Sequence, residues 1–385
     1  MPNGRTFAKP HRPFNQPVSA PPQHPVFIAP PMTNLTNLKL PLDVILPGVD
    51  DQITQAGQLV FHTVGDTGGI NGTEVQDVLA AVMQSHIDAS RSAGKANEEP
   101  RFLYHLGDVV YYNGMSRHYR EQFYEPYQGY DAPIVAIAGN HDGDTRIRRG
   151  DEPDDEPTLH GFMEHFCASQ AQFLFKHRET MTQPYVYWTL DTPLATIIGL
   201  YSNVDGYMDA PGTFEQQRWL EQQIKDAPTD RALIIAVHHP AYSLDTAHGG
   251  YAGIEGALDR AFKASARLPD LVLSGHVHCY QRFTRTHGKH EIPYLVAGAG
   301  GYAHTAGGMH QLAKSPATGQ KIRTPFQTAL NGVKLAAYND SEPGFLRIKV
   351  TRKQIIGEYF TADFVGALQG VRDHFEIDLL KHKVK

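Results

Sequence analysis

From about residue 58 onwards, short apolar runs alternate with helical patterns, and few folds are compatible with such an alternation. Residues 59–64 form a mostly apolar run of strand length, and residues 73–91 repeat apolar side chains at helical spacing. Further strands are predicted on the same criteria at 101–106, 134–138, 184–190, 195–200, 233–237, 271–273 and 294–296, and further helices at 213–226 and 254–267. Strands and helices in this order predict an α/β fold.

Local signals add detail to this pattern. The stretch at 344–361 alternates apolar and polar side chains, with Lys353 near its middle, and is predicted to be an antiparallel β-hairpin. Thr213 is predicted to cap the helix at 213–226. The acidic run at 151–156 follows three arginines and is predicted to be an exposed loop insertion.

The N-terminal segment differs from the rest of the chain, because its first 50 residues hold 11 of the 26 prolines. Proline breaks helices, and the segment has few apolar residues with which to build a core. We therefore predict an extended, helix-free arm over residues 1–55 and one domain over residues 56–385. The sequence leaves open whether the arm packs across the domain or a partner chain, or is a floppy tail.

Composition excludes several classes of protein. With 41% hydrophobic and 20% charged residues the chain is not wholly disordered, and it has no apolar run of roughly 20 residues that would span a membrane. A net charge of −6 argues against a nucleic-acid partner, which needs a basic surface. Two cysteines, Cys167 and Cys279, exclude a disulfide framework. No secretory leader follows Met1, which favours the cytoplasm.

Side chains of metal-binding type follow five of the predicted strands. They are Asp66, Asp108 with Tyr111, Asn140 with His141, His238 with His239, and His276 with His278. In open α/β sheets, ligands bind outside the carboxyl ends of the strands, so these side chains are predicted to meet at one edge. One such turn is a weak signal, whereas five turns of this kind in succession are a strong one.

The chemistry of these side chains points to metal ions. They combine hard carboxylate and phenolate oxygens with imidazole nitrogens, which suit iron, zinc and manganese. The mixture predicts two adjacent metal ions, an arrangement that catalyses displacement at phosphorus. Asp108 is the natural candidate for a carboxylate shared by both ions. Cys279 is expected to point away from the ligands, and Cys167 is expected in a helix core.

Five short blocks of the sequence resemble those of the calcineurin-like metallophosphoesterases. They are Gly65-Asp66-Thr67-Gly68, Gly107-Asp108-Val109-Val110-Tyr111, Gly139-Asn140-His141-Asp142, Val237-His238-His239-Pro240 and Gly275-His276-Val277-His278. Gly68 stands where the wider family usually has histidine, and Tyr111 where it usually has an acid. Both departures are typical of the purple acid phosphatase branch. The resemblance covers about residues 58–301 and implies a four-layer αββα sandwich of two mixed sheets flanked by helices.

The resemblance also implies the ligands of two metal ions. The first is expected to be ferric iron bound by tyrosinate, and the second a divalent iron, zinc or manganese ion. The ligands of the first are Asp66, Tyr111 and His278, those of the second are Asn140, His238 and His276, and Asp108 is shared.

By the same resemblance, a metal-bound hydroxide attacks the phosphorus of a small phosphate ester. His141 is expected to reach the phosphate, and His248 to help protonate the leaving group. Members of the family carry two histidines near the second position, whereas Ala247 precedes His248 here. His239 is expected behind the ligands or at the surface. The histidines at 287, 290, 304 and 310 follow the site in loops, where each alone is expected at the surface and one is a candidate to line the pocket.

Three functions remain open at this point. The first is a phosphomonoesterase of the acid phosphatase type, the second a phosphodiesterase acting on cyclic nucleotides or lipid head groups, and the third a non-catalytic metal-binding module. The presence of all seven implied ligands favours an enzyme. Members of the purple acid phosphatase branch mostly lie outside the cytoplasm, which conflicts with the expectation drawn from the N-terminus.

Overall fold

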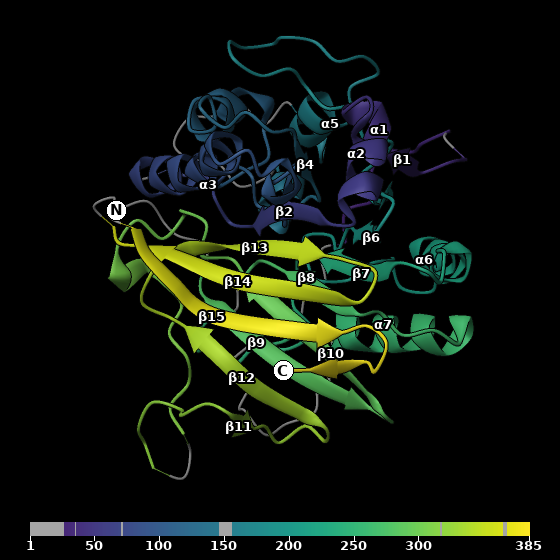
Figure 1. The fold of residues 1–385 in the computed structure, drawn as a ribbon, viewed down its shortest axis with the longest axis vertical. Helices are drawn as coiled ribbons and strands as arrows, with labels where there is room; N and C mark the ends of the chain where they lie inside the picture. The colour runs from purple at the N-terminus through teal and green to yellow at the C-terminus, as the bar shows by residue number, and fades with distance from the viewer. Residues whose placement is uncertain (1–26, 35, 71, 146–155, 316–317, 365–367) are drawn as a thin grey trace.

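The computed structural model describes residues 27–34, 36–70, 72–145, 156–315, 318–364 and 368–385, and the strands in these ranges form two mixed sheets (Figure 1). The strands of the larger sheet are β1 (Lys39–Pro41), β5 (Trp188–Asp191), β6 (Ala195–Leu200), β7 (Ala232–Val237), β8 (Leu271–Ser274), β9 (Tyr280–His287), β10 (His290–Ala297), β11 (Phe326–Gln327) and β12 (Val333–Asn339). Those of the smaller sheet are β2 (Leu59–Val64), β3 (Leu103–His105), β4 (Ile134–Ala136), β13 (Gly344–Val350), β14 (Gln354–Ala362), β15 (Leu368–Asp378) and β16 (Lys383–Val384).

Helices lie outside the two sheets. In Figure 1, α1, α2, α3 and α5 gather above the smaller sheet, and α6 and α7 lie beside the larger one. The α-helices are α1 (Leu42–Ile45), α2 (Val49–Ala56), α3 (Glu74–Ser92), α4 (Asn140–Gly143), α5 (His160–Phe166), α6 (Glu215–Asp226) and α7 (Ala252–Ser265). Short 3₁₀ turns are η1 (Ala96–Glu98), η2 (Ser116–His118) and η4 (Ala306–Gly308), and η3 (Arg120–Tyr124) is a π-helical turn. Within the described residues, none of the helices has the length and apolar character that crossing a membrane requires.

Parallel strands lie in the middle of the larger sheet and at one end of the smaller one. The larger sheet runs β1-β5-β6-β7-β8-β10-β9-β12-β11 and the smaller one β16-β15-β14-β13-β2-β3-β4. β2, β3 and β4 are parallel and end level with one another, because Val64 lies opposite His105 and His105 opposite Ala136. β6, β7 and β8 are also parallel. The segments that follow these strands therefore leave each sheet on one side, at the carboxyl ends of its parallel strands.

The fully buried strand β7 shows how the layers pack. Ile234 lies in the same core cluster as Leu79 of α3, while the next residue, Ile235, lies in a second cluster with Leu220 of α6 and Leu258 of α7. Successive strand residues point to opposite faces, so one face of the larger sheet packs towards the smaller sheet and the other towards α6 and α7. The predicted αββα sandwich of two mixed sheets with flanking helices is confirmed.

The predicted strands and helices between residues 59 and 361 are confirmed in type, with shifts of a few residues at their ends. The largest shifts are in the strands predicted at 184–190 and 294–296, which begin at Trp188 and His290. The hairpin predicted at 344–361 is formed by β13 and β14. The cap of α6 is corrected, because Thr213 donates its hydroxyl to the Ala210 carbonyl. The Asp209 carboxylate instead accepts the backbone N–H groups of Gln216 and Gln217 in the first turn of the helix.

The N-terminal segment is not free of helix, so this expectation was wrong. Residues 1–26 lie outside the described residues, but α2 runs from Val49 across the predicted boundary at 55. Proline is disfavoured only in the interior of a helix. Pro41 and Pro47 precede α1 and α2 and are therefore compatible with them. Val49 and Ile53 are buried in the main core, and β1 pairs with β5. The acidic run predicted as a loop lies, apart from Glu156, outside the described residues.

A pair of histidines, the buried His62 and the half-buried His86, lies between α3 and the smaller sheet. His62 Nδ1 is 3.0 Å from the Tyr130 hydroxyl, and His62 Nε2 is 3.2 Å from His86 Nδ1. The ring of Phe360 packs against His86. Burial lowers the pKa of His62 well below its usual value and lowers that of His86 to about 4, with further lowering by the nearby Arg347.

Because of this pair, we expect the free energy of unfolding to fall as the pH drops below about 6.5. The unfolded chain binds protons at these histidines in that range, whereas the folded chain does not until its lower pKa is reached. For His86 alone the loss down to about pH 4 is on the order of 3 kcal/mol. Urea titrations at neutral and acidic pH would measure it. His86→Gln should flatten the pH dependence, and the same slope in this variant as in wild type would contradict the assignment. His287→Asn, at an exposed position, is the matched control.

Candidate metal centre

The segments that follow the parallel strands carry all seven predicted ligands to one place, Tyr111 three residues after Asp108. Asp66, Asp108 and Asn140 follow β2, β3 and β4 of the smaller sheet. His238 follows β7 and His276 follows β8 of the larger sheet, with His278 two residues further on. A backbone hydrogen bond of 2.9 Å from Gly65 N–H to the Ala297 carbonyl joins the edges of the two sheets beside the site. The predicted convergence at strand ends therefore involves both sheets.

Three of these residues adopt a backbone conformation that is rare outside glycine. The angle φ is 59° at Asp66, 52° at Asp108 and 67° at His276. A left-handed φ at a residue with a Cβ atom costs about 1–3 kcal/mol and persists only where the surrounding structure imposes it. Strain of this kind gathers at functional sites. The turns therefore hold these side chains in place at a cost in stability.

Glycines next to the ligands allow the two sheets to approach closely. A Cβ atom at Gly139 would overlap Oδ1 of Asp108, and one at Gly275 would lie 2.6 Å from Oδ2 of Asp66. Neither position can carry a larger side chain without moving a buried carboxylate. These contacts explain why glycine precedes Asn140 and His276.

The first group of side chains surrounds the hydroxyl of Tyr111, and we call it the tyrosine cluster. It consists of Asp66, Asp108, Tyr111 and His278. The Tyr111 hydroxyl is 3.0 Å from Asp108 Oδ2, 3.2 Å from Asp66 Oδ1 and 3.3 Å from His278 Nε2. Ligands at about 2.0–2.2 Å from one metal ion are themselves separated by roughly 3.0–3.6 Å. The spacing of the cluster is therefore that of neighbouring ligands on one ion.

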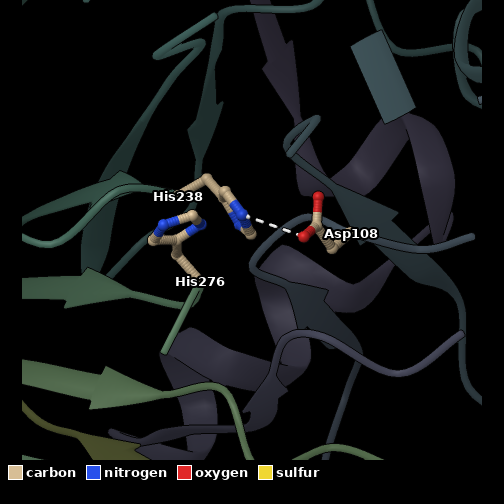
Figure 2. A group of neighbouring side chains, drawn as sticks. All are labelled: Asp108, His238 and His276. Atoms are coloured by element: carbon tan, nitrogen blue, oxygen red, sulfur yellow. Dashed lines mark ion pairs between the residues drawn. The ribbon is translucent and has the colours of Figure 1, made fainter. Parts of the chain in front are cut away.

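The second group surrounds Oδ1 of Asn140, and we call it the asparagine cluster. It consists of Asp108, Asn140, His238 and His276. Asn140 Oδ1 is 3.1 Å from His238 Nε2 and 2.9 Å from His276 Nδ1, and His238 Nε2 is 3.3 Å from Asp108 Oδ2. In Figure 2 the ring of His238 points to the Asp108 carboxylate, with His276 beside it. Ligand atoms of Asp108, His238 and His276 all lie within 4.8 Å of one another.

One oxygen atom joins the two clusters. Asp108 Oδ2 lies 3.0 Å from the Tyr111 hydroxyl and 3.3 Å from His238 Nε2, so it belongs to both. The other oxygen, Oδ1, accepts a hydrogen bond of 2.9 Å from the backbone N–H of His141, which fixes the carboxylate. This geometry is the one expected of a carboxylate shared between two ions.

The donor atoms fit positively charged ions. His238 Nδ1 donates to the Leu106 carbonyl at 2.8 Å, so in the neutral ring Nε2 holds a lone pair that faces the oxygens of Asp108 and Asn140. Burial, together with the charge of Asp108, raises the pKa of Asp66 to about 7. Burial opposes the charging of His238, but the carboxylates of Asp108 and Asp66 outweigh it and raise its pKa to about 9. The site is thus short of positive charge, which metal ions would supply.

Tyr111 needs such an ion to ionise. Burial, with the negative charges of Asp108 and Asp66, raises the pKa of its phenol well above the usual value. The predicted tyrosinate therefore requires a strongly polarising cation in the tyrosine cluster, as a trivalent ion would be.

The two predicted catalytic histidines lie next to the clusters. The His141 ring centre is 4.4 Å from that of Tyr111, and its Nδ1 donates to the Tyr112 carbonyl at 2.7 Å. The His248 ring centre is 4.4 Å from that of His276. His239 is buried, with its Nδ1 2.7 Å from the Ser202 hydroxyl, and packs behind His276. His239 therefore lies behind the predicted ligands and not at the surface.

Three supporting residues carried no recognisable signal in the sequence. The Tyr251 hydroxyl is 2.8 Å from His276 Nε2, which turns His276 Nδ1 towards Asn140. The Gln122 amide, in η3, clamps the backbone of Tyr111 by accepting from its N–H at 2.9 Å and donating to its carbonyl at 2.7 Å. The fully buried Asp142 carboxylate accepts from the N–H groups of Val109, Val110 and Gly139. Asp142 stood within a matched block, but its position gave no hint of this role.

Tyr251→Phe is expected to weaken metal binding at the asparagine cluster about 10- to 100-fold, the usual effect of removing a partner that orients a ligand histidine. Competition with a chelator of known affinity, using zinc or manganese, would measure the change. Tyr242→Phe is the matched control, because this buried tyrosine lies in the same connection between β7 and α7 but directs its hydroxyl to Glu255 at 2.8 Å. Equal metal affinity in the Tyr251 variant and wild type would show that the hydroxyl does not orient His276.

Comparison with known proteins gives consistent matches. The family model described as calcineurin-like phosphoesterase matches residues 60–280. Among curated relatives, Purple acid phosphatase 22 of Arabidopsis thaliana is 27% identical over 143 residues, which cover 35% of this chain and 32% of that protein. The alignment thus spans about a third of the length of that relative.

Solved structures show the same fold. The purple acid phosphatase PPD1 from yellow lupin (Lupinus luteus) seeds aligns with 83% of this chain and 54% of its own, with a TM-score of 0.55 and 17% identity. The structure of PhoD aligns with 85% of this chain and 71% of its own, with a TM-score of 0.56 and 14% identity. At this level of identity the likeness concerns the arrangement of the two sheets and their helices.

Proposed function

Because the chain belongs to the calcineurin-like phosphoesterase family, we propose that it is a dinuclear-metal phosphohydrolase that cleaves small phosphate monoesters. One observation carries the proposal, namely that Asp108 Oδ2 belongs to both ligand clusters. A shared carboxylate of this kind is what a pair of ions about 3.5–4 Å apart requires, and such pairs serve in-line displacement at phosphorus.

The residues of the two clusters fit the predicted ions. Asp66, Tyr111 and His278 would hold ferric iron, and Asn140, His238 and His276 would hold divalent iron, zinc or manganese, with Asp108 between them. The phenolate and carboxylate oxygens suit the harder trivalent ion, whereas the two imidazoles and the amide suit a divalent one. When bound, the two ions would acidify a water molecule and draw electron density from the phosphoryl oxygens.

The chain itself would bind and orient the ester. His141 donates through Nδ1 to the Tyr112 carbonyl, so its Nε2 is the atom left to contact the substrate. His248, whose ring lies beside that of His276, would hold the oxygen of the leaving group and supply its proton. The buried carboxylates of Asp66 and Asp108 would offset part of the charge of the ions, and the positive charge that remains would favour an anionic substrate.

A test of this function combines metal analysis, a visible absorption spectrum and a substrate screen on the purified protein. We expect about two metal ions per chain, iron included, a broad visible band from tyrosinate-bound iron(III), and faster turnover of phosphate monoesters than diesters at mildly acidic pH. A colourless protein that binds two ions and prefers diesters would instead be a phosphodiesterase. A protein that binds two ions and cleaves neither class would be the non-catalytic metal-binding module.

A further inference from the structure

Two loops that are far apart in the sequence are joined beside the ligands. One follows β7 and carries His248, and the other follows β10 and carries His310. The backbone N–H of Thr246 donates to the Gln311 carbonyl at 3.0 Å, and that of Ala313 donates to the Leu244 carbonyl at 2.8 Å. These bonds make a short antiparallel ladder, centred on a bridge between Asp245 and Leu312. The position of one histidine is therefore tied to that of the other.

A buried carboxylate shapes the first of these loops. Asp245 accepts hydrogen bonds from the Ser243 hydroxyl at 2.7 Å and from the backbone N–H groups of Ala247, His248 and Gly249 at 2.7–2.8 Å. A carboxylate that accepts three backbone N–H bonds fixes the turn that it closes. The backbone of His248 is thus held by the same loop that pairs with residues 311–313.

The second loop places His310 against a predicted ligand. The rings of His310 and His278 are stacked, with centres 4.2 Å apart and planes 15° apart. The His248 ring lies on another side of His310, at 4.8 Å between centres. His278 donates its backbone N–H to His310 Nδ1 at 3.0 Å. Since Nδ1 accepts this bond it carries no proton, so the neutral ring of His310 carries its proton on Nε2.

We propose that His310 contacts the substrate, and that together with His248 it forms a pair of imidazoles that binds the oxygens of the phosphoester. The pair lies next to both clusters, because His248 packs against His276 and His310 against His278. His310 supplies an N–H donor from Nε2 without needing to change its protonation state. Ala247 has no polar side chain to offer at the neighbouring position of the first loop. This inference rests on the proposed phosphoesterase function.

Two substitutions separate a substrate contact from a structural role. In His310→Asn the side-chain oxygen replaces Nδ1 and keeps an acceptor for the His278 N–H, but nothing replaces Nε2. In His310→Gln the longer amide places an N–H near the position of Nε2. His304→Ala, at an exposed position of the same loop, is the matched control. The probe is inorganic phosphate, whose binding to the metal-loaded protein is measured alongside metal content and kinetics.

We expect His310→Asn to retain both metal ions and to bind phosphate roughly 10- to 100-fold more weakly, the effect of losing one hydrogen bond to a charged group. KM for a monoester should rise with it, His310→Gln should restore most of the affinity, and His304→Ala should match wild type. Wild-type phosphate affinity in His310→Asn would overturn the proposal. So would loss of metal in that variant, which would make His310 a residue that positions His278.

These measurements also keep the two proposals apart. If the wild-type protein binds phosphate but turns over no ester, the proposed function fails while the phosphate measurement still decides the role of His310. If the wild type is an active phosphatase and His310→Asn is unchanged, only the inference about His310 fails.

Discussion

Asp108→Asn is expected to reduce kcat/KM for phosphate monoesters by at least about 1,000-fold and to lower the metal content of the protein. The substitution keeps the shape of the side chain but removes the one negative charge that both clusters share. In the wild type, Oδ2 of Asp108 lies 3.0 Å from the Tyr111 hydroxyl and 3.3 Å from His238 Nε2, so both ions would lose an anionic ligand. Steady-state kinetics with metal analysis of the same samples would measure both effects.

The stability of the metal-free variant shows whether such a loss is due to unfolding. Without metal, the charge of Asp108 repels Asp66 but attracts the buried imidazole of His238, whose pKa it helps to raise to about 9. We therefore expect metal-free Asp108→Asn to remain folded at the temperature of the assay, which a thermal unfolding curve would show. Asp226→Asn, at an exposed position near the end of α6, is the control for the substitution itself. Full activity with two ions bound in Asp108→Asn would contradict the shared-ligand assignment.

Tyr111→Phe is expected to abolish the visible absorption band of the iron-loaded protein and to reduce turnover about 100-fold or more. The phenylalanine ring keeps the packing against Tyr302 and His141, whose ring centres lie 4.1 and 4.4 Å away. Only the oxygen that lies 3.0–3.3 Å from three other ligand atoms is lost. An absorption spectrum at known iron content, followed by kinetics, would measure the effect.

Tyr112→Phe is the matched control for this experiment. Its side chain is 37% exposed, and its hydroxyl accepts a hydrogen bond from Tyr302 at 3.0 Å rather than facing the clusters. The band should persist in this variant. A band that survives in Tyr111→Phe and disappears in Tyr112→Phe would show that Tyr112, and not Tyr111, is the tyrosinate ligand.

The sequence correctly predicted the strands that carry the site. The strand at 59–64 is a short apolar run, and the helix at 73–91 and the hairpin at 344–361 repeat apolar side chains about every 3.6 and every two residues. Near neighbours in the chain determine all three patterns. The sequence was a poor guide to elements whose apolar pattern is weak. β9 and β12 were not predicted, and they pair with each other through a register shift next to Ala337. Nor was α2 predicted, because a count of prolines says little about the proline-free stretch that forms it.

The candidate metal centre shows the same contrast between what neighbouring residues reveal and what depends on packing. The predicted ligands and their order along the chain came from the sequence, through the strands that they follow and the resemblance of their blocks to a known family. Which residues support them was decided only by the tertiary structure. Tyr251 meets His276, Gln122 clamps Tyr111 and His310 stacks on His278, although 25, 11 and 32 residues separate them. Such contacts depend on how two sheets and their loops pack, and that packing leaves no periodic trace in the sequence around any one residue.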